Sequence, residues 1–232
     1  MLQFEIKDGV AIIPEGTTMI GDYAFSGCSS LTSITIPSSV TSIGKCTFSG
    51  CSSLTSIEVD GGNRIYDSRE GCNAIIETAT NTLIAGCKST IIPSSVTSIG
   101  KCTFSGCSSL TSITIPSSVT EIGMWAFYGC SSLTSVTIPN SVTSIGESTF
   151  RGCSSLTSIM IPSSVTKIAP WTFKGCSSLT SVTIPNSVTL IGPWVFEECS
   201  SLTSINIPAN KTNYYKKRLI KGLHQFIVEM DM

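Results

Sequence analysis

The chain has 232 residues, a formal net charge of -1 and only 12% charged residues. It offers no basic field that could hold nucleic acid, so we predict no nucleic-acid partner. The positive mean hydropathy comes from Ile, Val, Leu and Cys spaced along the chain. Because no apolar run reaches the roughly 18 residues of a membrane span, we also predict no membrane insertion.

Residues 1–27 depart from the pattern that follows them. The segment 10–14, Val-Ala-Ile-Ile-Pro, only approximates the later repeats. Residues 1–8 contain neither the basic segment nor the apolar segment of a secretory signal, so no signal peptide is predicted there. A repeat structure exposes an open strand edge at its first coil, and such edges promote aggregation. We therefore expect residues 1–27 to form an N-terminal cap and a first, atypical coil.

One repeat unit recurs between residues 28 and 208, with a step of 23 in the numbering, as from Cys107 to Cys130. It is clearest after Cys107, where Cys-Ser-Ser-Leu-Thr-Ser-[IV]-x-Ile-Pro-x-Ser-Val-Thr-x-Ile-[GA]-x-x-x-Phe-x-[GE] is written four times in succession. A fixed period of this size is the signature of a solenoid, in which each repeat packs only on its neighbours. We predict one domain over residues 1–232, with residues 28–208 as its repeats.

Each repeat is predicted to fold as one coil that is mainly β. Residues 31–37 carry the pattern Leu-x-x-Ile-x-Ile of a leucine-rich-repeat strand, and Pro37 ends it because proline cannot donate to the ladder. A second short strand is expected over residues 40–44, followed by a turn that contains Phe48 and Cys51. One coil buries too little apolar surface to offset its backbone entropy, so stacking into parallel sheets is obligatory.

Most of the eleven cysteines are predicted to be core residues. Seven of them occupy one position of the repeat, which favours a column of small buried side chains over a disulfide framework. The seven are Cys28, Cys51, Cys107, Cys130, Cys153, Cys176 and Cys199.

No metal and no cofactor are predicted. One cysteine in each coil lacks the Cys-x-x-Cys spacing of a zinc site. Residues 60–70 contain several oxygen ligands, but their spacing does not match a calcium-binding EF-hand loop, and Arg64 and Arg69 neutralise much of the charge. Turn chemistry is the favoured explanation of that loop.

One coil carries an insertion near residues 60–87. The interval from Cys51 to Cys107 exceeds two regular steps of the repeat, so this coil contains extra residues. Residues 73–77 and 82–86 flank the polar residues 78–81 and predict a β-hairpin that pairs Glu77 with Thr82. That register places Cys72 opposite Cys87, so the two form a candidate disulfide in an oxidising compartment and remain reduced thiols otherwise.

Residues 209–232 are predicted to cap the C-terminal end. The repeat stops after Pro208, and residues 210–219 indicate a short helix with a basic run. That run is either a solvated face of the cap or a site for an anionic partner. His224, the single histidine, lies in this cap, so the chain lacks the convergent titratable groups that acid–base and nucleophilic catalysis need. We predict no catalytic residues and no enzymatic activity.

Two variable positions of the repeat lie near the turn that closes each coil. The first turn column stands two residues before the repeat phenylalanine and holds all three tryptophans of the chain. The second turn column stands directly after that phenylalanine. The first turn column is Tyr23, Cys46, Cys102, Trp125, Ser148, Trp171 and Trp194, and the second is Ser26, Ser49, Ser105, Tyr128, Arg151, Lys174 and Glu197.

These columns supply the candidate partner-binding residues. Aromatic side chains and arginine gathered on one edge have the composition of a binding hot spot. The alternative is that each ring lies flat over its own turn and shields Phe127, Phe173 or Phe196. The candidate residues are Tyr23, Trp125, Tyr128, Arg151, Trp171, Lys174 and Trp194.

The repeat Leu-Thr-Ser-Ile-Thr-Ile-Pro-x-Ser-Val-Thr-x-Ile-Gly-x-x-x-Phe-x-Gly-Cys resembles the BspA-like leucine-rich-repeat family over residues 10–208. The interrupted coil also resembles an insertion found in that family. The resemblance implies a curved, non-enzymatic solenoid of the kind found on bacterial and protist surfaces, with members linked to adhesion to host matrix proteins and to other cells.

Our leading hypothesis is therefore a protein-binding solenoid at the cell surface or secreted, whose partner is an extracellular-matrix or cell-surface protein. The alternative is a cytoplasmic protein-interaction scaffold, which the absence of a signal-like segment at residues 1–8 favours.

Overall fold

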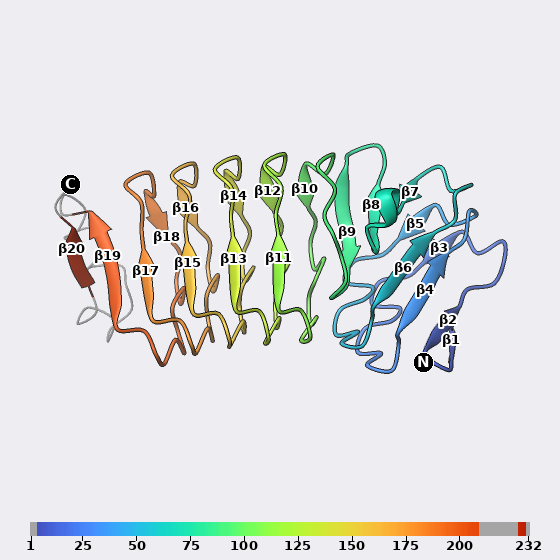
Figure 1. Cartoon of the computed structure of the whole chain (residues 1–232), viewed down its shortest axis with the longest axis horizontal. Coiled ribbons are helices and arrows are strands. Elements are labelled where there is room, and N and C mark those ends of the chain that lie inside the picture. Colours follow the sequence, from blue (N-terminus) through green and yellow to red (C-terminus); the bar gives the residue numbers. More distant parts are fainter. Residues whose placement is uncertain (1–3, 209–226, 231–232) are drawn as a thin grey trace.

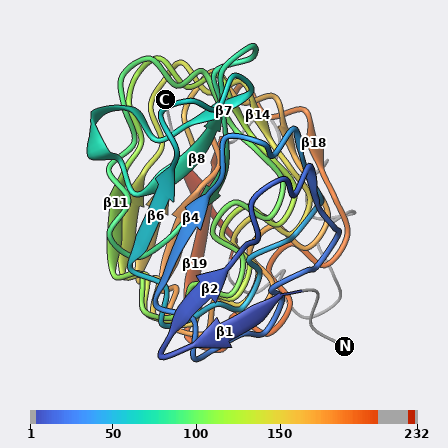
Figure 2. The same ribbon diagram turned by 90° about the vertical axis from the view of Figure 1, so that its right-hand side faces the viewer.

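The computed structural model describes residues 4–208 and the backbone of residues 227–230. The chain winds into a β-solenoid whose coils stack along one axis (Figure 1). Figure 2 looks along this axis from the N-terminal end and shows successive coils lying behind one another. The predicted solenoid of leucine-rich repeats, built mainly from parallel strands, is confirmed.

The first strands of the coils pair in parallel within three ladders, β2-β4-β6, β11-β13 and β15-β17-β19, and partners such as Ser181 and Ser204 are one repeat apart. Alternation sends one set of side chains inward: in β4, Ile34 and Ile36 are buried and Thr35 is exposed. These strands are β2 (Val10–Ile12), β4 (Ser33–Ile36), β6 (Ser56–Val59), β11 (Ser112–Thr114), β13 (Ser135–Thr137), β15 (Ser158–Met160), β17 (Ser181–Thr183) and β19 (Ser204–Pro208).

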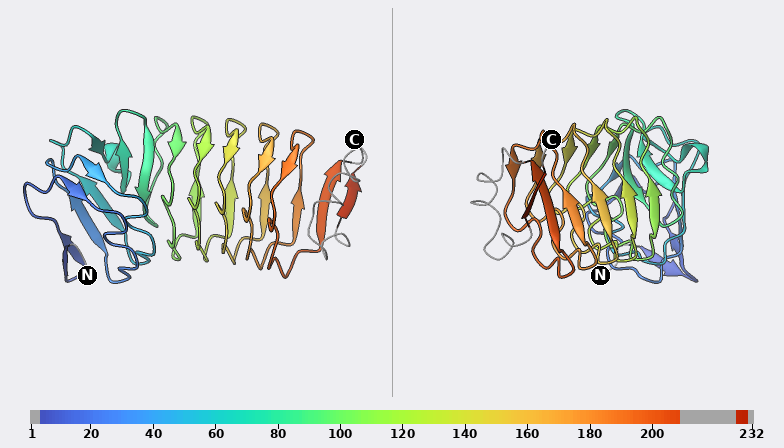
Figure 3. Two further views of the ribbon diagram at one scale, coloured as in Figure 1. Left: turned by 180° about the vertical axis from the view of Figure 1, so that it is seen from behind. Right: turned by 60° about the vertical axis from the view of Figure 1, so that its left-hand side comes forward.

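The second strand of each coil is shorter than predicted, since only two residues of each Val-Thr-x-Ile segment join a ladder. Seen from behind, in the left panel of Figure 3, the coils follow one another at regular intervals through the C-terminal half. The second strands are β3 (Met19–Ile20), β5 (Ser42–Ile43), β10 (Ser98–Ile99), β12 (Glu121–Ile122), β14 (Ser144–Ile145), β16 (Lys167–Ile168) and β18 (Leu190–Ile191).

Hydrogen bonds at the repeat interval join each coil to the one before it. The Thr203 hydroxyl, for example, donates to the carbonyl oxygen of Thr180 at 3.1 Å, and the Thr203 amide donates to the same oxygen at 2.9 Å. Inside the coils the repeat phenylalanines stack nearly parallel, with ring centroids 5.4 Å apart for Phe127 and Phe150. The same two contacts therefore recur from coil to coil on either side of the insertion.

The cysteine column is buried, as its spacing predicted. Most thiols of the column donate a hydrogen bond to a phenylalanine carbonyl oxygen of the preceding coil. Cys153 Sγ, for example, lies 3.2 Å from the carbonyl oxygen of Phe127. Burial disfavours the thiolate and raises the pKa of Cys51, Cys107 and Cys199 from the ordinary 9.0 to about 12. These thiols are core groups that stay protonated at neutral pH.

An antiparallel hairpin closes the N-terminal end of the stack. Strand β1 (Glu5–Lys7) pairs with β2 and covers its outer edge. Asp8 and Gly9 form the connecting turn with φ values of 51° and 81°. Asp-Gly is the typical signal of a two-residue hairpin turn, so this pairing was readable from the sequence, although we predicted only a cap.

The predicted inserted hairpin is present as β8 (Ala74–Glu77) and β9 (Thr82–Gly86), with Glu77 opposite Thr82. It is preceded by β7 (Tyr66–Asp67) and a short 3-10 helix, η1 (Arg69–Gly71). Together with β10, β12 and β14, these strands form one six-stranded sheet in the order β14-β12-β10-β9-β8-β7.

The register expected for Cys72 and Cys87 differs from the observed one. A bulge between Ile75 and Ile76 shifts the pairing so that Ala74 lies opposite Gly86. Continuing this register brings Cys87 opposite Asn73, whose carbonyl oxygen accepts a hydrogen bond from Cys87 Sγ at 3.5 Å. Adjacent strand residues point to opposite faces, so the one-residue shift separates the two thiols, and both are free.

The hairpin divides the core. Buried residues up to Tyr66, joined by Ile75, Ala85 and Cys87, form one cluster, and a second cluster contains Phe104 and the later repeats. Gly86 of β9 lies against the Phe104 ring, and a methyl group there would come within 2.2 Å of that ring. In Figure 1 the strands β4 and β6 are inclined to β11, β13 and β15, as expected when a hairpin is wedged into one side of the stack.

The turn edge remains continuous across this insertion. Gly50 donates from its amide to the carbonyl oxygen of Ser105 at 2.8 Å, and the Ser49 and Ser105 hydroxyls lie 2.8 Å apart. At Gly106, which has a φ of 70°, a methyl group would approach the Gly50 backbone to 2.6 Å. The turns at residues 45–51 and 101–107 therefore stack directly, although the whole insertion separates them in sequence.

The C-terminal end carries one further parallel strand, β20 (Ile227–Met230), which pairs with β19. The helix predicted over residues 210–219, its basic run and His224 lie outside the described residues.

We expect the buried thiols to make stability fall in alkali. Such a thiol has a pKa of about 12 in the folded protein and about 9 in the unfolded chain, so between these two pH values only the unfolded chain ionises. The free energy of unfolding is therefore unaffected by the thiol below about pH 9 and falls as the pH rises towards about 12. Each such thiol removes at most about 1.4 kcal/mol of the free energy of unfolding per pH unit above 9. Urea unfolding at about pH 8 and about pH 10 measures this slope.

The Cys153→Ala variant provides the control, since it removes one buried thiol from the column. Its stability at neutral pH can fall because of the small cavity, but the slope of stability against pH should become shallower. An identical slope in the variant would show that the column does not titrate as described.

Candidate protein-binding edge

Both turn columns lie on the edge where each coil closes. Every residue of the first turn column has a positive φ, between 51° for Cys46 and 58° for Trp125. This left-handed conformation costs a non-glycine residue roughly 1–2 kcal/mol. Since tyrosine, cysteine, serine and tryptophan all occupy the column, the backbone turn defines the position and the side chain is free to vary.

The C-terminal candidates form two close groups. Trp171 and Trp194 stack with ring centroids 5.2 Å apart and planes within 4°. Lys174 Nζ lies 2.6 Å from Glu197 and 3.3 Å from Glu198, and the hydrogen bond to Glu197 is the main reason that the pKa of Lys174 is raised. These contacts leave Lys174 neutralised by acidic neighbours.

The candidates nearer the insertion are joined by a cation–π contact. The Arg151 guanidinium lies over the Tyr128 ring, 5.7 Å from its centroid. Ser148, which is buried, occupies the first turn column between Trp125 and Trp171. The predicted residues therefore do not form one unbroken surface, because no ring contact joins Trp125 to Trp171 in the part of the chain that the structure describes.

A groove of about 170 Å³ opens on this edge between Tyr23 and Trp125. Its aromatic walls are exposed, at 50% for Tyr23, 37% for Trp125 and 39% for Tyr128. We call it the aromatic socket, and its lining residues are Tyr23, Cys46, Ser49, Cys102, Ser105, Trp125 and Tyr128.

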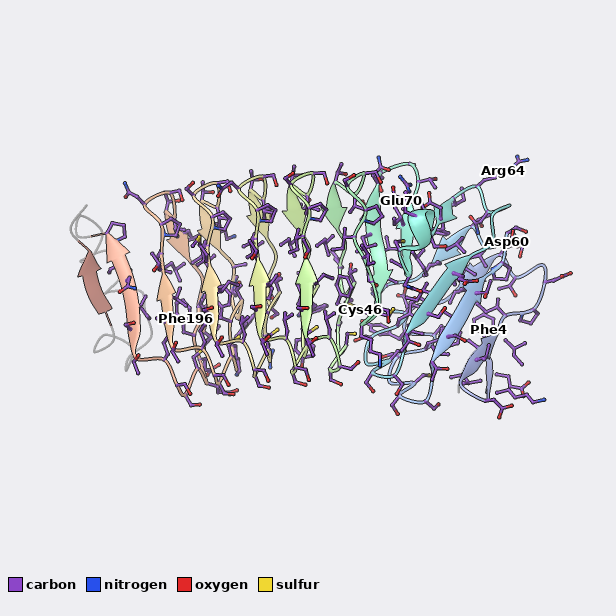
Figure 4. The ribbon with its side chains drawn as sticks, viewed as in Figure 1. Phe4, Cys46, Asp60, Arg64, Glu70 and Phe196 are labelled. Atoms are coloured by element: carbon purple, nitrogen blue, oxygen red, sulfur yellow. A yellow bond between two sulfur atoms is a disulfide. The ribbon has the colours of Figure 1, made fainter. Side chains whose placement is uncertain are left out.

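The floor of the aromatic socket is a disulfide that the sequence analysis missed. It joins Cys46 to Cys102, whose Cα atoms are 5.1 Å apart. Figure 4 labels Cys46 at the junction between the inclined N-terminal strands and the C-terminal coils. A signal was available: the two cysteines are consecutive members of the first turn column if the inserted coil contributes no residue to it.

A second cavity, of about 250 Å³, lies beside the same disulfide on the side of the hairpin. Tyr66 lines it, and the Tyr66 hydroxyl accepts a hydrogen bond from the Ile43 amide at 3.1 Å. Burial raises the pKa of Tyr66. Because the Tyr66 hydroxyl is already hydrogen-bonded to the neighbouring coil, we regard the aromatic socket as the better candidate site for a partner.

The buried phenylalanines do not depend on the rings of the first turn column. Phe104 and Phe150 follow Cys102 and Ser148, which carry no ring, yet both are as fully buried as Phe127. Shielding of the core therefore does not require a tryptophan in this column.

The loop over residues 60–70 uses its polar groups in turns. Asn63 Nδ2 donates to the carbonyl oxygens of Pro37 and Val40, each at 2.9 Å, and Asp67 is paired with Arg69 at 2.7 Å. Within the described residues, no group of three or more His, Cys, Asp or Glu side chains is placed to hold a metal ion. None of the helices in that part of the chain has the length and apolarity to cross a membrane.

Coils stacked at a constant repeat interval, parallel strands with the Leu-x-x-Ile-x-Ile pattern and a buried phenylalanine column define a leucine-rich-repeat solenoid. The chain matches the family model described as a BspA type leucine rich repeat region in six copies, over residues 10–73, 84–203 and 126–223. It belongs to that family. No curated protein matches the chain.

Several solved structures are similar to this chain. A leucine rich cell surface protein from Faecalibacterium prausnitzii A2-165 is 33% identical with a TM-score of 0.77, over 90% of this chain and 56% of that one. A leucine-rich repeat protein from Eubacterium ventriosum is 31% identical with a TM-score of 0.74, over 84% and 55%. The leucine-rich repeat protein of T. pallidum is 30% identical with a TM-score of 0.55, over 90% and 79%. The chain thus spans just over half the length of the first two.

Removing the Cys46–Cys102 disulfide should destabilise the protein. The bond closes a loop with a sequence separation of 56, for which the chain-entropy model gives about 4 kcal/mol. The Cys46→Ser/Cys102→Ser double variant should therefore unfold at a lower urea concentration than the oxidised wild type.

Dithiothreitol provides the matched control for this prediction. It should lower the stability of the wild type towards that of the double variant and leave the variant unchanged. Equal stability of the oxidised and reduced wild type would contradict the predicted role of the bond.

Proposed function

We propose that this chain is a non-enzymatic, protein-binding solenoid that contacts its partner through the aromatic side chains of its turn edge. The observation that carries the proposal is that exposed rings occupy a position where the fold does not need them, since Phe104 and Phe150 are buried without a ring beside them. Rigid aromatic side chains bury a large area at low entropic cost, which is why they dominate binding hot spots.

The proposed setting is the cell surface, in adhesion to an extracellular-matrix or cell-surface protein. Two observations support it. The similar Faecalibacterium prausnitzii structure is described as a cell surface protein. The Cys46–Cys102 disulfide also favours an oxidising environment, because such bonds persist outside the cytosol.

A cytoplasmic interaction scaffold is the second candidate. It is favoured by the nine cysteines that are free in the described structure, all of them buried. Digestion of the full-length product by protease added to intact source cells supports the surface setting, and digestion only after lysis supports the scaffold. The turn edge is the proposed contact surface in either setting.

Replacing Trp125, Trp171 and Trp194 together with serine should weaken partner binding by at least about tenfold, because each hot-spot aromatic typically contributes about 2 kcal/mol or more. The stack should remain folded, since Ser148 already occupies this column. Binding to a panel of immobilised matrix proteins, compared with the wild type at equal circular dichroism, provides the measurement.

Met160→Ser is the matched control, because Met160 is a 78% exposed apolar residue on the strand face of the same coils. It should leave affinity unchanged. Loss of binding in Met160→Ser combined with full binding in the triple variant would move the site to the strand face and reject the turn edge.

A further inference from the structure

We propose that the aromatic socket takes one tyrosine or tryptophan side chain of the partner, presented in a segment that carries a carboxylate beside that ring. This inference deepens the function proposed above and rests on it. It concerns only the socket and Arg151 beside it, not the Trp171–Trp194 stack at the far end of the edge.

The size of the socket suits a single ring. At about 170 Å³ it is smaller than the roughly 300–1,000 Å³ of typical small-molecule sites. Tyr23 and Trp125 are separated in the first turn column by the two short cysteines, so they stand roughly 14 Å apart at three strand spacings. A planar group can enter between them and meet their rings in the offset or edge-to-face arrangements that aromatic pairs prefer.

The floor of the socket matches a ring with a polar tip. The Cys46–Cys102 sulfur atoms are soft and polarisable, and sulfur makes favourable contacts with aromatic rings. The Ser49 and Ser105 hydroxyls lie 2.8 Å apart, so one donates to the other. One hydroxyl proton and several lone pairs then remain for a guest, which favours the hydroxyl of tyrosine or the indole N–H of tryptophan over phenylalanine.

The charged group that contacts the lining of the socket is a cation. Arg151 lies over Tyr128, which lines the socket, and it forms no ion pair among the described residues. Lys45, beside Cys46, is paired with Asp22 at 3.4 Å. Lys101 lines the second cavity, and neither Lys101 nor Glu147 lines the socket. A carboxylate next to the guest ring would complement the unpaired Arg151, whereas a cationic guest in this aromatic site would be repelled by it.

A sugar ring is a poorer match than an aromatic side chain. Aromatic walls suit both, but a sugar presents several hydroxyl groups that must find partners when buried. The polar side-chain groups of the lining are the Ser49 and Ser105 hydroxyls, the Tyr23 and Tyr128 phenols and the Trp125 indole N–H, without any carboxylate or amide. Most hydroxyls of a bound sugar would therefore be left unpaired.

Three capped peptides test the inference against the full chain. The first is Gly-Asp-Trp-Asp-Gly, the second replaces its Trp with Ala, and the third replaces both Asp with Lys. At millimolar peptide we expect only the first to shift the backbone amide resonances of Ser49 and Ser105 in NMR spectra. Equal shifts with the alanine or the lysine peptide, or no shift with any peptide, would overturn the proposal.

Variants localise the binding. Tyr23→Ser and Trp125→Ser should each weaken binding of the first peptide by about tenfold or more. Trp194→Ser is the matched control, because Trp194 has the same left-handed backbone and 42% exposure but does not line the socket, and it should bind as the wild type does. Cellotetraose serves as the sugar probe, and shifts produced by it and not by the peptide would replace the aromatic guest with a glycan.

The outcomes also separate this inference from the broader function. If Trp171→Ser and Trp194→Ser weaken binding to the matrix protein while Trp125→Ser does not, the socket fails and the turn edge stands. If the triple tryptophan variant binds its partner normally, the turn edge itself fails, whatever the peptide does.

Discussion

The hydrogen bond from one coil to the residue one repeat earlier fixes how successive coils align, and the side-chain contacts between coils depend on this alignment. A single coil cannot satisfy its own strand groups, so the threonine before most first strands donates from its amide and its hydroxyl to a carbonyl oxygen of the preceding coil, as Thr203 does to Thr180. That register brings equivalent side chains into line. The stacked Phe127 and Phe150 rings and the thiol of Cys153 against the Phe127 carbonyl follow from it, because neither contact exists within one coil.

The insertion shows how much disturbance this register tolerates. The β8–β9 hairpin enters the core side, where Gly86 gives the Phe104 ring room to lie against the backbone, and it splits the hydrophobic core into two clusters. On the turn side, Gly50 and Ser105 close the stack as if the inserted residues were absent. The Cys46–Cys102 disulfide lies at this junction and covalently joins the turn edges of the two halves.

The turn edge is where this scaffold can vary without a loss of packing. Its first column is held at positive φ by the backbone, so the fold accepts a buried Ser148 and an exposed Trp194 in equivalent places. Function on a repeat surface then depends on which side chains occupy such positions in consecutive coils. The combination of Tyr23, two cysteines and Trp125 leaves a gap between aromatic walls, whereas Trp171 and Trp194 in adjacent coils simply stack on each other.

The period, the inward-facing residues, the buried cysteine column and the inserted hairpin with its Glu77–Thr82 pair could all be predicted from the amino-acid order, because they depend on local pattern and on a constant repeat length. The pairing of the cysteines could not be predicted in the same way, because the first turn column places Cys46 next to Cys102 but does not say whether the inserted coil comes between them. The bulge near Ile75 separated Cys72 from Cys87, and the accommodation of the insertion on one side of the stack brought Cys46 to Cys102. Contacts between coils depend on which side of the stack the inserted residues occupy, and the spacing of residues along the chain does not specify that side.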